Sequence, residues 1–399
     1  MRQLLSNIWN YDFTNSSEHA LKVMGWLALA FLIMFGVYDL LFDTGAGYYG
    51  LLTGYLSKHE NPLSAYMGYD AFRLLTLVVL GGLFVYITAF GALSFYVTIK
   101  RYNYRNFMRI FFAHFLSNIV ALLFTIAFFA LLGALAHAAG FTYQQGSNAI
   151  QNGFKWIEDF IKSYVPTLVN TPYPVALVLG LVLGALPGYI THWFGHHSRL
   201  VWYASHRCHH TAEIMHAAGI GPFMFLPELF GAIPAIFFSA VCTKLFFHEP
   251  LLFETLALSL LGILTEKFNH TTAFYKFAYS NPLVRGLSAY FGNGVYHYMH
   301  HTSKEGEEII NVGGSPFLIW DRLFGTYRIP TKELPTVGLT NNPIIKLSPF
   351  AIMFSGFQQI AYELKHNKDF KTRFWILFGS VYYKPPVSKD YLILGYPDK

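Results

Sequence analysis

The sequence predicts an all-α fold: a polytopic membrane protein with a transmembrane helical anchor and a cytosolic helical domain that carries a cage of histidines. Three observations predict it. The chain of 399 residues is 54% hydrophobic and 13% charged, with a mean hydropathy of +0.36, outside the range of soluble globular domains. Several apolar runs are long enough to cross about 30 Å of hydrocarbon. Most of the 17 histidines lie between His192 and His301.

The apolar runs give the spanning helices in order. We expect spans at residues 21–42, 71–99, 110–139, 173–190 and 223–247. A shorter run, 251–264, follows the HEP turn at His248 and is expected to form a hairpin arm. The first run has no small-residue cleavage site and is too long for a signal-peptide core, so it is expected to be retained. Cys208 and Cys242 stand in no CxxC pattern, which predicts two reduced thiols.

Basic residues between the second and third runs predict the orientation. Lys100, Arg101, Arg105 and Arg109 place this loop in the cytoplasm by the positive-inside rule. Alternation then puts the amino terminus and the histidines on the cytoplasmic side of a multi-pass protein, in either a bacterial inner membrane or the endoplasmic reticulum. We expect the basic cluster to contact anionic lipid or to dock an acidic electron carrier, and we expect no nucleic acid partner.

The composition divides the chain into three regions. Residues 1–172 form an N-terminal transmembrane region, and residues 173–330 carry nearly all the histidines and form the candidate catalytic region. Residues 331–399 form a C-terminal cytosolic or interfacial tail, in which segment 350–379 is expected to contain one or two helices.

Nine histidines form an ordered series of metal-ligand spacings. At i, i+3 and i+4 on a helix, imidazoles share a face and can point into one cavity. The motifs are HWFGH, HRCHH, an isolated histidine and HYMHH, giving the candidate catalytic and metal-binding residues His192, His196, His206, His209, His210, His270, His297, His300 and His301.

Some histidines are ambiguous. HWFGHH pairs His192 with either His196 or His197, and we favour His196 because residues i and i+4 face the same way. His197 is a candidate for supporting a ligand, and the sequence leaves His216 open. Glu213 and Glu266 are possible nearby carboxylates, more simply explained as supporting or surface groups. Ordinary structural roles are expected for His19, His59, His114, His137, His248 and His366.

Nine imidazoles exceed the needs of one metal ion, and two closed tetrahedral zinc sites would take eight. The set therefore suits two metals with open coordination positions. Imidazole binds iron, zinc, copper or nickel, so the ligand type does not select the metal. Iron is favoured because two irons with open positions can reduce dioxygen and oxidise a lipid C–H bond, and zinc is a possible substitute.

From residue 187 to 327 the sequence resembles the fatty acid hydroxylase/sterol desaturase superfamily of integral-membrane, non-haem di-iron enzymes. The order of the histidine motifs matches, and WDRLFGTY, residues 320–327, resembles a segment that follows them in that family. From its residues alone, this segment is expected to form an amphipathic turn that packs under the site, with Asp321 or Arg322 as candidates to orient a ligand. The first motif departs from the family's usual HRxxH, because an upstream Asp and the Arg after the first histidine are missing. This indicates a divergent branch.

The resemblance implies an oxygen-dependent lipid hydroxylase or desaturase, an oxidoreductase that takes its substrate from the bilayer. The sequence has no haem-binding HPGG segment and no dinucleotide fingerprint, so electrons are expected from a separate protein, cytochrome b5-like or ferredoxin-like. Two other classes stay open: a zinc-bound lipid-binding or scaffold protein on the same frame, and a metal transporter. The lipid and the position of oxidation are not predicted.

Overall fold

The computed structural model describes residues 104–216, 225–252, 254–256, 258, 275, 279–291, 295–304, 306–307, 309–313, 318–339 and 349–388. Within these ranges the chain is mostly helical and contains no strand, only the isolated bridges Ser198–Ser380 and Thr302–Val337. The all-α prediction is confirmed for this part of the molecule. The predicted spans 21–42 and 71–99 and most of the 251–264 arm lie outside the described residues.

A long apolar helix with one interruption leads to the histidines. Helix α9 (Tyr173–Gly184) continues into α10 (Leu186–His197), with a single interruption at Ala185. Pro187, near the start of α10, has no backbone N–H and so cannot donate a hydrogen bond to the preceding turn. Together α9 and α10 form the 25-residue helix Tyr173–His197, the one described helix that is both long and apolar enough to cross a membrane. Multi-pass topology stays a prediction.

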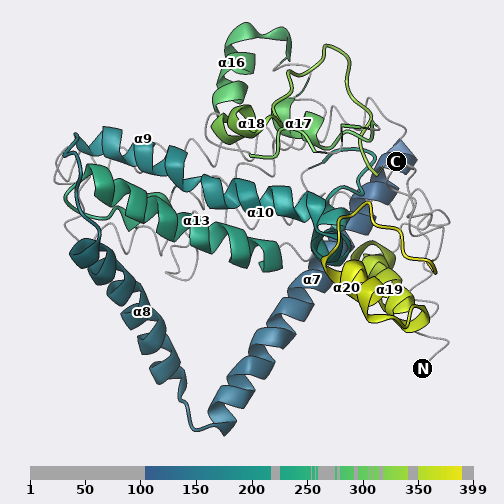
Figure 1. The fold of residues 1–399 in the computed structure, drawn as a ribbon, viewed down its shortest axis with the longest axis horizontal. Coiled ribbons are helices and arrows are strands. Elements are labelled where there is room, and N and C mark those ends of the chain that lie inside the picture. Colours follow the sequence, from purple (N-terminus) through teal and green to yellow (C-terminus); the bar gives the residue numbers. More distant parts are fainter. Residues whose placement is uncertain are drawn as a thin grey trace.

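Helix α13 (Phe225–Phe246) lies alongside α9 and α10, as Figure 1 shows. The close approach depends on Gly180 and Gly184, which are buried one turn apart on α9. A Cβ added at Gly184 would collide with the Ser239 side chain and lie 2.6 Å from Ser239 Cα, and one at Gly180 would collide with Thr243. Small residues spaced four apart let apolar helices pack this closely.

Gly184→Ala should therefore destabilise the protein by about 1–3 kcal/mol, because the added methyl group must push the two helices apart. Gly188→Ala is the matched control one turn further along, since its Cβ would meet nothing within 4 Å. Its effect should be neutral or stabilising by less than about 1 kcal/mol. Chemical denaturation in detergent measures both, and equal midpoints for the two variants would contradict this account of the packing.

Two further helices extend away from this core in a V (Figure 1). Helix α7 (Tyr104–Ala138) contains all but the last residue of predicted run 110–139, and its apolar side chains beyond Leu123 are largely exposed. Helix α8 (Tyr143–Tyr164) begins with a capping box in which Thr142 and Gln145 satisfy each other's backbone N–H groups. Its far end is tied to the turn that follows α13 by the Lys162–Glu249 ion pair.

The segment between the first two histidine motifs is covered by helices from the C-terminal part of the chain. Helix α19 (Pro349–His366) packs against α7 and the π-helical turn η3 (Trp202–His206), and α20 (Phe370–Phe378) packs against α11 (Arg199–Val201). The backbone N–H of Arg199 donates to Gly379, and that of Val381 donates to His197. The helices predicted for segment 350–379 are present. The domain boundary at residue 330 stays a prediction, although the helices beyond it pack directly on the histidine-bearing segment.

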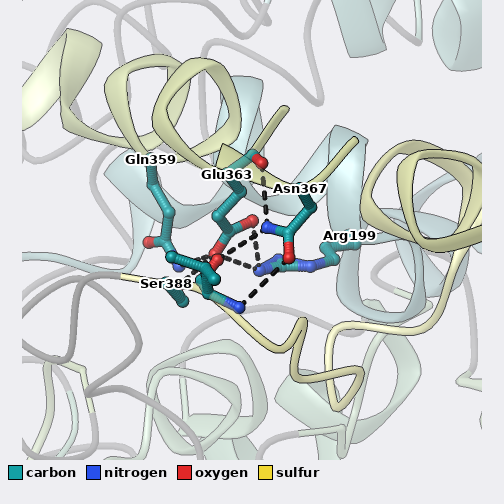
Figure 2. Close-up of polar contacts among 6 residues, drawn as sticks. Arg199, Gln359, Glu363, Asn367 and Ser388 are labelled. Carbon is teal, nitrogen blue, oxygen red and sulfur yellow. Dashed lines mark hydrogen bonds and ion pairs between the residues drawn. The ribbon is translucent and has the colours of Figure 1, made fainter. Parts of the chain in front are cut away.

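A buried polar network joins these parts, as shown in Figure 2. Arg199 Nη2 donates to both carboxylate oxygens of Glu363, each at 2.7 Å, and both side chains are essentially inaccessible to solvent. Gln359 and Ser388 also donate to Glu363, and Asn367 holds the chain at Val387 through two backbone hydrogen bonds. Both cysteines are buried free thiols, as predicted.

Candidate metal centre

The first histidine pair is placed by α10. His192 and His196 are one helical turn apart in its last two turns and face the same side, with ring centroids 5.3 Å apart. Gly195 lies between them, and a Cβ there would sit 3.3 Å from the His206 ring. The glycine in HWFGH therefore leaves room for the second motif to approach the first.

The second motif occupies the π-helical turn η3, the short helix α12 (Arg207–His209) and its C-terminal cap, His210. Nε2 of His206 lies 2.9 Å from Nε2 of His196, and Nε2 of His210 lies 3.2 Å from that of His206. His209 turns the other way. π-helical turns are rare and occur often at functional sites.

The third motif is on α17 (Val295–His300), whose side chains are all buried. Nε2 of His297 and Nε2 of His301 are 3.1 Å apart, and the His209 ring lies 4.3 Å from the His301 ring. His300 points instead to the first pair, with its Nε2 3.3 Å from Nε2 of His196.

Eight of the predicted ligands thus converge in two groups. Within each group, the ring nitrogens that could bind a metal ion all lie within 4.8 Å of one another. The five-histidine group contains His192, His196, His206, His210 and His300, and the three-histidine group contains His209, His297 and His301. The groups are neighbours, because the rings of His210 and His301 stack at 4.3 Å. His270, the ninth predicted ligand, and Glu266 lie outside the described residues.

The chemistry of the two groups fits metal ions. Burial lowers the pKa of His206 and His210 well below the usual range, and neighbouring imidazoles lower it further, so both rings are neutral near pH 7. His300 donates from Nδ1 to the Ile310 carbonyl at 2.8 Å, so its Nε2 carries a lone pair, which faces the five-histidine group. Neutral imidazoles oriented by a backbone carbonyl are the usual form of histidine metal ligands.

Other candidates from the sequence lie elsewhere. His197 turns away from the groups: its ring stacks on Trp193 at 3.7 Å and its Nδ1 donates to the Trp193 carbonyl. Glu213 is exposed and belongs to neither group. His114 is a buried core residue that hydrogen-bonds Thr211 and lies 5.4 Å from the His216 ring.

Comparison with known proteins gives one family. Residues 177–326 match the model of the family described as Fatty acid hydroxylase. The matched region is similar to the fatty acid hydroxylase family. The match includes all nine predicted ligands and most of WDRLFGTY, and it confirms the family resemblance. Comparison with curated proteins and with solved structures gives no significant match.

The fatty acid hydroxylase region implies an oxidoreductase that acts on lipids, and its histidine groups can hold metal ions. The apolar helix Tyr173–His197, in whose last turns the first ligands lie, agrees with a membrane setting.

Sequence reasoning missed one part of the fatty acid hydroxylase region, the loop 310–313. Its backbone contacts two histidines of the five-histidine group: Ile310 accepts from His300, and Val312 hydrogen-bonds His192. The glycine pair in NVGG, soon after the last histidine motif, was the signal available in the sequence.

Proposed function

We propose that this protein is a membrane-bound di-iron lipid oxygenase that uses dioxygen to hydroxylate or desaturate a lipid C–H bond. One observation carries the proposal: within a region that matches the fatty acid hydroxylase family, histidines from three separate segments meet in two adjacent groups, in which every ring but the half-buried His192 is buried. Histidine groups of this kind are hard to explain by packing, because buried polar side chains are costly unless they bind a partner.

The residues would share the work as follows. The nine histidines, His270 included, would hold two iron ions, and iron, when bound, would supply the reduction of dioxygen and the oxidation of the C–H bond. Burial of the histidines excludes bulk water from the reaction. Because His192 and His196 lie at the end of a helix long enough to span the bilayer, a lipid chain can reach them from the hydrocarbon.

The proposed reaction determines which co-substrate and which partner protein are needed. Hydroxylation consumes dioxygen, an electron pair and protons and releases water, so an external electron-transfer protein of the cytochrome b5 or ferredoxin type is required. We place the site on the cytoplasmic face of the membrane because Lys100, Arg101, Arg105 and Arg109 precede α7's apolar stretch. By its charge, the same cluster would attract an acidic carrier.

The proposal can be tested on detergent-purified protein by measuring bound metal and lipid products together. We expect about two irons per chain by plasma mass spectrometry, and hydroxylated or desaturated lipids formed only with dioxygen and a reductant. Zinc-substituted protein is the matched control and should form no product.

Two other outcomes would favour the alternatives. Protein that binds two zinc ions and stays inactive after iron reconstitution would be the zinc-bound lipid-binding or scaffold protein. Metal uptake into vesicles without lipid oxidation would indicate a transporter. Protein that binds no metal at all would overturn the proposal.

A further inference from the structure

Asp321, in the WDRLFGTY segment, is a fully buried carboxylate with a defined set of partners. It lies on helix α18 (Ile319–Phe324) and is 0% exposed. The backbone N–H groups of Val312 and Gly313 donate to its two oxygens at 2.6 and 2.8 Å, and the Thr326 hydroxyl donates at 2.6 Å. Burial raises the pKa of Asp321, and these hydrogen bonds oppose that rise.

The loop that Asp321 holds is also fixed by other hydrogen bonds and by its backbone conformation. Asn311 is in the left-handed region, with φ of 49°. Its N–H donates to the Thr326 carbonyl, and its side-chain oxygen accepts from the Arg328 N–H. A Cβ on Gly313 would collide with the Asp321 carboxylate, so this position needs glycine. Asp321 on α18 and two residues after the helix, Thr326 and Arg328, therefore fasten the loop.

The same loop contacts the candidate metal centre from its other side. The Ile310 carbonyl accepts the Nδ1 proton of His300 at 2.8 Å, and the Val312 backbone hydrogen-bonds His192. The Ile310 contact sets the rotation of the His300 ring and keeps its proton off Nε2, the nitrogen that faces the group. Both rings belong to the five-histidine group.

We propose that Asp321 is a positioning residue for the five-histidine group: it clamps the loop 310–313, whose backbone holds His192 and His300 in their ligand orientation. The proposal rests on the metal centre of the proposed function and is independent of the lipid chemistry. A partner of this kind that supports metal ligands typically changes metal affinity by about 10–100-fold.

Co²⁺ titration of the metal-free protein tests this, because the visible spectrum of Co²⁺ reports coordination geometry. Asp321→Asn has nearly the same shape, but its amide NH₂ would face a backbone N–H that now donates to a carboxylate oxygen. We expect affinity at the five-histidine group to fall about 10–100-fold with an altered spectrum, while the three-histidine group binds as in the wild type.

Leu323→Ala is the matched control, because Leu323 is on the same helix and is 66% exposed. It should leave both binding phases unchanged. Thr326→Val is the second test variant, to be used if Asp321→Asn does not fold. It perturbs the same loop less, because it removes only one of the three hydrogen bonds to the Asp321 carboxylate. It should weaken the same binding phase by a smaller factor.

The outcomes separate this inference from the proposed function. Wild-type binding of two Co²⁺ ions with unchanged affinities and spectra in folded Asp321→Asn or Thr326→Val would overturn the positioning role alone. Equal weakening of both groups would also overturn it, because that is the result of a purely structural role. Wild-type protein that binds no Co²⁺ would overturn the metal centre itself.

Discussion

His300→Ala should remove the metal ion of the five-histidine group and abolish lipid oxidation, although His300 belongs to the same motif as His297 and His301. Its Nε2 faces Nε2 of His196 at 3.3 Å, whereas the other two histidines of the motif face each other. Metal content should fall from about two ions to about one per chain, with turnover reduced by more than the ~100-fold typical of a supporting residue.

His209→Ala should have the complementary effect, because His209 belongs to the three-histidine group. His197→Ala is the control: it removes an imidazole adjacent to a predicted ligand in sequence, but one that stacks on Trp193. It should retain both metals and most activity. Plasma mass spectrometry and a Co²⁺ titration distinguish the three variants, and a loss of metal in His197→Ala would contradict the assignment of His196.

Glu363→Ala should destabilise the protein by about 3–5 kcal/mol, because it leaves the Arg199 guanidinium buried without its charge partner. Arg199 is 1% exposed and donates to both oxygens of Glu363. The variant also removes the acceptor for Gln359 and Ser388. Denaturant unfolding in detergent, followed by tryptophan fluorescence, measures the change in the free energy of unfolding.

Two controls separate charge burial from loss of packing. Arg199→Met combined with Glu363→Leu replaces both partners by apolar side chains and should recover most of the lost stability. Lys304→Ala breaks the ion pair with Glu307, in which the lysine is 67% exposed, and should change stability by less than about 1 kcal/mol. If Glu363→Ala costs no more than Lys304→Ala, the buried pair does not have the role assigned to it.

The convergence of the histidines was predictable from their spacing, but the division into two groups was not. In each of the three motifs the i and i+4 residues stay together: His192 with His196, His206 with His210, and His297 with His301. The i+3 residues, His209 and His300, join the opposite group. Residues i+3 and i+4 diverge by about 100° around a helix, so the i+3 ring reaches the second group. Helical periodicity predicts the angle between the i+3 and i+4 rings. Which histidine group each ring joins depends on how the three segments pack together.

The contacts that support the histidine-bearing segments from elsewhere in the chain were less predictable for a different reason. Arg199 and Glu363 meet across 164 positions of sequence, and the loop 310–313 holds His300 through the backbone carbonyl of Ile310, a group that any residue type possesses. Periodicity detects neighbours along one helix and gives no information on such distant pairs. Asp321 and Arg322 of WDRLFGTY were both candidates to orient a ligand, and only the structure shows that it is Asp321 whose carboxylate accepts from the loop 310–313.

The cover formed by α19 and α20 has a consequence for biosynthesis. Every predicted ligand has been translated by residue 301, yet the partners that bury Arg199 and pack on the second motif are synthesised only later, up to Ser388. A ribosome that stops between residues 301 and 388 releases a chain that has every predicted ligand but lacks part or all of the C-terminal cover over Arg199 and the second motif. Metal loading is therefore expected to follow completion of the C-terminal helices, and a premature stop codon after the last histidine should be as damaging in a cell as the loss of a ligand.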